Sequence, residues 1–395
     1  MTSEHSIAAH WTGEFDESAL QSWAAGVRAR LPAPSVSLGL VFMAPKYFPY
    51  AKQILETLRV HAQIPLLAGC SGKSLIFSAE EREGDAGLAL ALYHLPGADL
   101  RATYFNQQNV EEADAPAYWH EKTGVPPDET NGWLAFVDPF HIDGEAWLRG
   151  WGAAYAPRPV LGGLASGEFS DQLTQVYLNG EVFDEGGVAI SVGGSVALHA
   201  VISQGCTPIG ETWTLTKVEQ NLIHQIGNRP AYEVLAETVN HLSLAEQQKS
   251  RGNLFVGLAM NEYLEDFHRG DFLVRNLLGA DPQSGIVAIG ALPRIGQTIQ
   301  FQRRDAAAAT EDMRALLVRA RKELEGATIY GGCLCSCNGR GKSLFGAPHH
   351  DARMIQEELG PLGLAGFFCN GEIGPVGGKN FLHGYTASLA LFVKK

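Results

Sequence analysis

Apolar runs, helical segments and glycine turns follow one another in the same order three times along the chain. Each segment has an apolar strand, a helix, a second strand, a glycine turn with a polar residue, and a closing strand. Short apolar runs bounded by turn residues indicate buried strands. The ranges are 37–43, 46–59, 65–70 and 87–95 in the first segment; 133–137, 144–155, 159–165, 173–183 and 188–202 in the second; and 329–337, 351–359, 362–369 and 385–393 in the third.

The turns after the second strands align with small gaps. They read Leu-Ala-Gly-Cys-Ser-Gly-Lys at 67–73, Leu-Gly-Gly-Leu-Ala-Ser-Gly-Glu at 161–168, and Leu-Ala-Gly-Phe-Phe-Cys-Asn-Gly-Glu at 364–372. Irregular spacing excludes a solenoid. We therefore predict an α/β (or α+β) protein of two halves, built from duplicated strand–helix–strand units. Helices cover its sheets, and the glycine turns gather at one cleft. The alternative is chance recurrence of glycine turns in a chain with 45 glycines.

The remaining segments suggest a domain division. Apolar runs at 254–261, 272–278 and 286–292 have no long helix between them, which favours antiparallel pairing. A helix is predicted at 231–242, a loop at 246–251, and a helix lead-in at 303–309, with Thr310 as the cap of a helix that ends at 324. We expect an N-terminal extension at 1–34, a first domain at 35–230 and a second at 231–395.

Composition and charge narrow the class of protein. The 395 residues are 45% hydrophobic and 18% charged, as in globular proteins. A formal charge of −13 argues against a nucleic-acid partner or an anionic membrane surface. Residues 1–18 lack the pattern of a signal peptide. The uncharged run 186–203 contains glycines and His199, which favours a strand or hairpin over membrane insertion. We expect a cytoplasmic protein whose six cysteines stay reduced.

The candidate chemistry lies in the last quarter of the chain. Alternating cysteines at 333, 335 and 337 run into Asn338-Gly339-Arg340-Gly341, and a second strand ends at Gly371-Glu372. The Arg340 guanidinium offers a planar charged fork and the Glu372 carboxylate an acceptor, which together suit a zwitterionic or polar small molecule. The alternative is an Arg340–Glu372 ion pair that braces the two turns.

These residues carry a resemblance to a known family, the FIST domain, a two-part module of bacterial signalling proteins that also occurs in an F-box protein. The similarity lies in Ser336–Gly341, in Leu364–Pro375 and in His383, and more loosely in Gly69-Cys70-Ser71. The chain departs from the family pattern at Gly72-Lys73-Ser74, where a carboxylate is usual. The resemblance implies a sensory module with amino acids as proposed ligands. We therefore expect a cytosolic module that binds an amino acid-like polar metabolite and acts through a signalling partner protein.

The same residues also allow metal-binding, thiol and acid–base chemistry to be considered. Cysteines two apart on a strand are separated by about 6.5 Å between Cα atoms, too far to chelate zinc together, so no metal and no cofactor are predicted. Cys337, beside Arg340, is a candidate reactive thiol. Glu168 and Glu372 occupy matching positions in two repeats, where paired carboxylates could serve acid–base work. A thiol- or carboxylate-assisted hydrolase or transferase, and a protein-interaction scaffold, therefore stay as alternatives.

The predicted ligand-binding set combines the three turns with the residues of the last quarter. Its members are Cys70, Ser71, Ser166, Glu168, Cys337, Asn338, Arg340, Gly366, Asn370, Gly371, Glu372 and His383.

Overall fold

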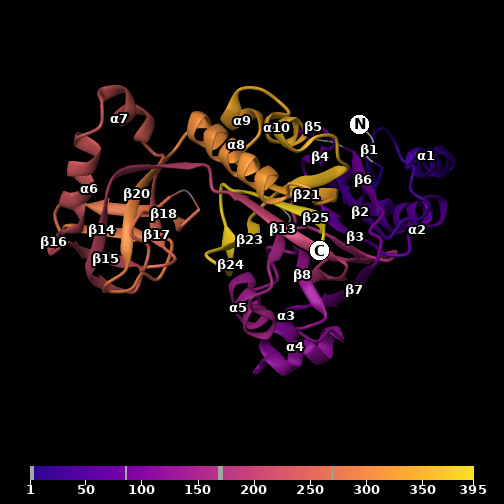
Figure 1. Ribbon diagram of the computed structural model, residues 1–395, viewed down its shortest axis with the longest axis horizontal. Helices are drawn as coiled ribbons and strands as arrows, with labels where there is room; N and C mark the ends of the chain where they lie inside the picture. The colour runs from indigo at the N-terminus through magenta and orange to yellow at the C-terminus, as the bar shows by residue number, and fades with distance from the viewer. Residues whose placement is uncertain (1–3, 85–86, 168–171, 269) are drawn as a thin grey trace. The chain divides into compact units, whose positions relative to one another are not determined.

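The computed structural model describes residues 4–84, 87–167, 172–268 and 270–395 (Figure 1). The chain forms two compact units. Unit 1 comprises Met1–Ile202 and Leu316–Lys395, and unit 2 comprises Ser203–Ala315. Unit 2 is therefore inserted in the sequence of unit 1.

Unit 1 is built from three repeats of one supersecondary unit. Repeat 1 contains β1 (Ser6–Trp11), α1 (Glu17–Arg30), β2 (Leu38–Met43), η1 (Pro45–Tyr50), α2 (Ala51–His61), β3 (Leu67–Ser71), β4 (Leu75–Phe77), β5 (Glu80–Arg82) and β6 (Leu88–Tyr93). Repeat 2 contains β7 (Ala98–Phe105), α3 (Gln107–Glu112), α4 (Pro116–Thr123), β8 (Thr130–Val137), α5 (Gly144–Tyr155), β9 (Val160–Leu164), β10 (Val176–Leu178), β11 (Glu181–Phe183) and β12 (Gly187–Gly194). Repeat 3 contains β13 (Val196–Ser203) and, further along the chain, α8 (Ala306–Glu323), whose residues divide between the two units. It continues with β21 (Ile329–Cys337), α9 (Lys342–Phe345), α10 (His350–Leu359), β22 (Leu364–Cys369), β23 (Glu372–Val376), β24 (Lys379–His383) and β25 (Ala387–Lys394).

The repeats exchange hairpins in a closed cycle. In the described part of unit 1 the strand orders are β1-β6-β2-β3-β10-β11, β7-β12-β8-β9-β23-β24 and β13-β25-β21-β22-β4-β5. In each sheet a parallel pair, such as β2 and β3, is flanked by the closing strand of its own repeat. The outer hairpin comes from another repeat: repeat 2 supplies sheet 1, repeat 3 supplies sheet 2, and repeat 1 supplies sheet 3. The predicted α/β class and repeated strand–helix–strand units are confirmed.

Each sheet has an inner and an outer face. The inner faces of all three sheets pack into one apolar core, in which the rings of Phe42, Phe136 and Phe367 lie 5.0 to 6.1 Å apart. Helices α1 and α2 cover the outer face of sheet 1, and α4 and α5 cover that of sheet 2 (Figure 1). Local sequence signals explain how α5 starts and packs. Asp143 caps the helix by accepting the Ala146 N–H, and Trp147 and Trp151, four residues apart, place two buried rings on one helical face.

A glycine holds the two parallel strands together in every repeat. A Cβ atom on Gly69, Gly162 or Gly366 would lie only 1.7, 1.9 or 1.8 Å from a backbone oxygen of the neighbouring strand. The register pairs are Val41 with Gly69, Ala135 with Gly162, and Leu334 with Gly366. Only glycine permits this backbone approach, so the recurrent glycine of the aligned turns has a packing role.

Unit 2 contains a small antiparallel barrel. Its elements are β14 (Cys206–Glu219), β15 (Leu222–Ile226), β16 (Arg229–Pro230), α6 (Ala231–Asn240), α7 (Leu244–Ser250), β17 (Leu254–Ala259), β18 (Phe272–Asp281), β19 (Ile286–Ile289) and β20 (Thr298–Arg304). The strand order is β14-β20-β17-β18-β19-β15-β16, and an additional β14–β15 pairing closes it. The antiparallel pairing predicted for this region is confirmed.

Several local predictions were wrong. The segment predicted as a loop at 246–251 overlaps α7, which Ser243 and Glu246 open with a reciprocal capping box. That Ser-x-x-Glu signal was readable in the sequence. Thr310 lies inside α8 and does not cap it; the Ala308 N–H bonds to Asp305. The uncharged run 186–203, predicted as a strand or hairpin, is extended as expected, but it forms two strands, β12 and β13, that belong to different sheets and make no hairpin.

We predict that Gly366→Ala lowers the free energy of unfolding by about 3 kcal/mol or more, because the added methyl group would overlap the Leu334 carbonyl. The control is Gly26→Ala in α1, where an added Cβ meets no atom within 4 Å. That variant should gain about 1 kcal/mol from helix propensity. Urea unfolding measures both. A Gly366→Ala protein as stable as the parent would contradict the packing role.

Candidate functional site

The three glycine turns meet in unit 1 through direct hydrogen bonds. Ser166, from repeat 2, donates its backbone N–H to Ser71 O at 3.1 Å. Its Oγ accepts the Lys73 N–H at 3.0 Å and donates to Phe368 O at 2.5 Å. One serine thus links the turns of repeats 1 and 3. We call residues 71–73, 164–166 and 368–371, together with Asn338, the turn junction.

Repeats 2 and 3 are joined further by the backbone around Asn370. The Asn370 N–H donates to Leu164 O at 3.1 Å, and its side-chain amide donates to Ala165 O at 3.0 Å. In return, the Leu164 N–H donates to Gly371 O at 2.7 Å. These bonds extend the pairing of β9 with β23, so the hairpin exchange itself brings the turns together.

The predicted residues from repeats 1 and 2 hold the junction from inside. Ser71 is buried, and its Oγ accepts the Gln175 N–H at 3.0 Å. Cys70 lies in the apolar core, where burial raises the pKa of its thiol well above the ordinary value. Gly366, from repeat 3, has the packing role described above. Glu168, the fourth predicted residue of the first two turns, lies outside the described residues.

Two amide side chains form the exposed surface of the junction. The Asn338 amide donates to Asn370 Oδ1 at 2.8 Å, and both residues are exposed. Asn338 is tied to the neighbouring strand by its N–H, which donates to Cys369 O at 3.1 Å. Lys73, on the turn of repeat 1, is also exposed. The junction therefore presents amides and a cation to solvent.

Glu372 is a fully buried carboxyl group behind this surface. Its Oε2 accepts the Thr386 N–H at 2.9 Å, and its Oε1 accepts the Cys369 thiol at 3.2 Å. Burial raises the pKa of Glu372 to about 8, so the group is mostly protonated at neutral pH. Its register partner His383 is also buried, and His383 Nε2 lies 3.0 Å from Gly374 O. A carbonyl oxygen only accepts, so Nε2 carries the proton.

Arg340 pairs with a residue that the sequence analysis did not single out. Its Nε and Nη2 donate to the two carboxylate oxygens of Asp351 at 2.7 and 3.0 Å, and its side chain is fully buried. Burial alone would raise the pKa of Asp351, but the Arg340 charge and a hydrogen bond from His350 outweigh it and hold the pKa below the ordinary range. The guanidinium braces the turn after β21 against the start of α10, and its two bonds to Asp351 replace the Arg340–Glu372 ion pair that was the alternative interpretation of the sequence.

Asp138, in repeat 2, is another buried acid, and it stands at the position that Asn338 holds in repeat 3. Asp138 directly follows β8, as Asn338 follows β21, and it is not among the residues predicted for the site. Its Oδ1 accepts the Thr174 hydroxyl at 2.8 Å, and its Oδ2 accepts the His141 N–H at 2.9 Å and faces His141 Nδ1 at 2.7 Å. An acid directly after a buried strand is the sequence signal that could have identified it.

Cys337 differs from the other cysteines in accessibility. It is half-buried, whereas the other five are buried. It is the register partner of Cys369 on the parallel strand, and its Sγ accepts the Gly339 N–H at 3.4 Å.

The fold and this junction define a class of protein: a triplicated α/β module whose repeats join their turns at one polar surface. The chain belongs to the FIST family of sensory domains. The profile of the FIST N domain matches residues 37–229, and that of the FIST C domain matches residues 231–375.

Relatives of the whole chain occur in mycobacteria. An uncharacterized protein of Mycobacterium tuberculosis is 35% identical over 372 residues, which cover 94% of both chains. An uncharacterized protein of Mycobacterium bovis is 34% identical over 368 residues, which cover 93% of both. A more distant one from Methanocaldococcus jannaschii is 24% identical over 264 residues, which cover 64% of this chain and 49% of that protein.

Two further observations concern the described residues as a whole. No helix among them has both the length and the apolar character needed to cross a membrane. Within the same residues, histidine, cysteine, aspartate and glutamate side chains form no group of three or more with a metal-binding arrangement.

The raised pKa of Glu372 predicts a pH dependence of stability. The folded protein holds this proton up to about pH 8, whereas an ordinary glutamate releases it near 4.5. Between these values the folded state binds more protons than the unfolded state, so the free energy of unfolding falls as pH rises. Glu81, with a pKa raised to about 7 by burial and by Asp351, acts in the same direction.

We therefore expect Glu372→Gln to flatten the decline in stability between pH 5 and 8, by at most about 1.4 kcal/mol per pH unit. Denaturant unfolding at three pH values measures the slope. Parallel curves for the parent and the variant would show that Glu372 titrates normally.

Cys337 should alkylate faster than any other thiol of the folded protein, because it alone among the six cysteines is not fully buried. Iodoacetamide labelling at neutral pH followed by peptide mass spectrometry measures the six rates. Labelling in denaturant provides the control, since all six rates should then converge. Faster labelling of Cys70 or Cys206 would contradict this prediction.

Proposed function

We propose that this protein is a sensory module that binds a small polar metabolite, such as an amino acid, at the turn junction and signals through a partner protein. The observation that carries this proposal is the bonding of three turns from three repeats through Ser166. A ligand seated there contacts groups that follow strands of different sheets. Its binding energy can therefore act on all three repeats at once.

The exposed groups suit a ligand that carries a carboxylate and neutral polar groups. The ammonium group of Lys73 meets the carboxylate, and the amides of Asn338 and Asn370 donate and accept neutral hydrogen bonds. Cys337 forms the apolar edge of the site. Charge-assisted bonds contribute about 1.5–3 kcal/mol each, so a small ligand needs few of them.

Arg340 and Glu372 have positioning roles in this proposal. The guanidinium is fully buried and bonds to both oxygens of Asp351, so in this proposal it fixes the turn that carries Asn338 instead of contacting the ligand. The Glu372 carboxyl fixes the start of β25 and the end of β22 through Thr386 and Cys369. His383, register partner of Glu372, supports the same hairpin.

The test is a thermal-shift screen of the twenty amino acids and of short-chain carboxylates against the full chain. A ligand at 100 times its Kd should stabilise the folded state by about 2.7 kcal/mol. Lys73→Ala and Asn370→Ala should each remove this stabilisation and change the melting temperature of the ligand-free protein by only a few degrees. The matched control is Lys52→Ala, which removes another exposed lysine, on α2, and should keep the ligand response.

Two outcomes would overturn the proposal. The first is an unchanged melting temperature for the parent with every compound, together with turnover of an ester or amide panel, which would favour the hydrolase alternative. The second is a ligand whose effect survives both substitutions, which would place the binding site elsewhere in the chain.

A further inference from the structure

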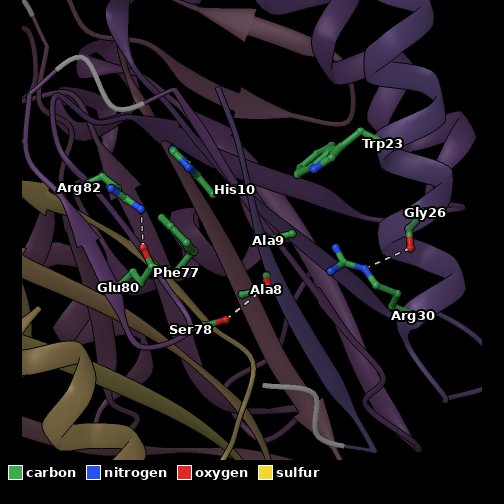
Figure 2. A pocket seen from close by; sticks show the side chains of 10 residues that line it. All are labelled: Ala8, Ala9, His10, Trp23, Gly26, Arg30, Phe77, Ser78, Glu80 and Arg82. Carbon is green, nitrogen blue, oxygen red and sulfur yellow. Dashed lines mark hydrogen bonds and ion pairs between the residues drawn. The ribbon is translucent and has the colours of Figure 1, made fainter. Parts of the chain in front are cut away.

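A groove of about 880 Å³ lies on unit 1, and it shares no residue with the turn junction. Three elements of repeat 1 line it: the strand β1, one face of the helix α1, and the β4–β5 hairpin. Figure 2 shows Trp23, Gly26 and Arg30 of α1 on one side, Phe77, Glu80 and Arg82 of the hairpin on the other, and β1 between them.

The floor of the groove is the edge of a strand. Ala8, Ala9 and His10 all line it, yet successive side chains of a strand point to opposite faces of a sheet. Three consecutive residues can share one groove only along the strand edge. β1 is the outer strand of its sheet, and within the described residues no strand pairs with it on the side away from β6. Ser78 Oγ donates to Ala8 O at 3.3 Å, so this main-chain acceptor of β1 faces the hairpin side and already has one donor. A carbonyl oxygen has two lone pairs and can accept a second hydrogen bond.

On the α1 side of the groove, Gly26 leaves the helix backbone uncovered by a side chain. Gly26 lies in the interior of α1, where glycine is less favourable than alanine. A Cβ atom at this position would meet nothing within 4 Å, so no contact inside the chain requires glycine. Trp23 and Arg30, one turn before and after it, also line the groove. A second main chain can therefore lie against α1 at Gly26.

The walls combine aromatic rings with guanidinium groups. The ring of His10 stacks on Phe77 with centroids 4.5 Å apart, which gives β1 and the hairpin a flat apolar surface. Across the groove, Arg30 is exposed, and its Nε donates only a long bond of 3.4 Å to Gly26 O. Arg82 is neutralised by Glu80 at 2.7 Å, so the positive charge lies on the α1 side.

We propose that this groove docks an extended peptide segment of a partner protein, which adds as a strand to β1 and places an acidic side chain against Arg30. Main-chain hydrogen bonds to an open strand edge give such complexes affinity, and side-chain pockets give them specificity. The guanidinium selects carboxylate because its planar fork fits the two oxygens. The other side chains of the segment that face the groove are small or apolar, since they lie between Trp23 and Phe77.

The probe is a phage-displayed library of random ten-residue peptides, selected on the immobilised full chain. Selection should enrich peptides that contain an acidic residue within a β-branched, alternating sequence. A labelled synthetic copy of the strongest peptide is then measured by fluorescence anisotropy. Arg30→Glu and Gly26→Trp should each weaken its binding about tenfold or more. N-methylation of alternate peptide nitrogens should have a similar effect, because it removes strand hydrogen bonds.

The matched control is Lys52→Glu, a charge reversal at an exposed lysine of α2 outside the groove, which should leave binding within about twofold. The proposal is overturned if no peptide is enriched, if the enriched peptides lack acidic residues, or if binding is indifferent to Arg30→Glu and to N-methylation. If Gly26→Trp fails to fold, the other two measurements still decide. The result is independent of the ligand screen at the turn junction.

Discussion

Three phenylalanine rings, one from each repeat, meet where the inner faces of the three sheets of unit 1 pack together. A sheet with one apolar face must bury it against another layer, and here the partner layers are the two other sheets. No single repeat can bury its inner face alone. The closed hairpin exchange reinforces this dependence, because each sheet needs two strands from another repeat to reach its full width.

The same arrangement explains where the polar chemistry lies. Each exchanged hairpin follows the glycine turn of its own repeat in the chain and pairs with the second parallel strand of another repeat. The turn is therefore held at the boundary between two repeats. The backbone groups at this boundary need partners, and Ser166 and Asn370 supply them. Polar residues at these turns thus have a structural function before any ligand is considered, which is why sequence alone could not separate the two roles.

Much of the fold was predictable because periodicity and turn chemistry agreed. The strand at 329–337 and the helix at 144–155 have the predicted bounds, since each is a continuous pattern with clear ends. The hairpin exchange was not predictable, because no local property of β4 or β10 specifies which sheet it joins. Arg340 was predicted to hold a ligand anion, with an ion pair to Glu372 as the alternative, whereas its partner Asp351 lies beyond the turn, on α10. The partner of a buried charge depends on how the elements pack together, and that packing depends on many residues at once and not on local spacing.

Arg340 and Glu372 are two buried ionisable groups in one region, and they differ in charge state. The guanidinium donates hydrogen bonds to both oxygens of Asp351, and this compensation keeps both groups ionised. Glu372 is fully buried, and this burial outweighs the Thr386 N–H, the cysteine thiol donors and the nearby Arg340 charge, so its carboxyl group remains protonated at neutral pH. A neutral acid can be accommodated beneath an exposed surface without a counter-charge. A change in the charge or polarity of the surface above Glu372 would alter its proton affinity. Because Glu372 bonds to Cys369 at the end of β22 and to Thr386 before β25, a change in its protonation would affect two strands of the third sheet.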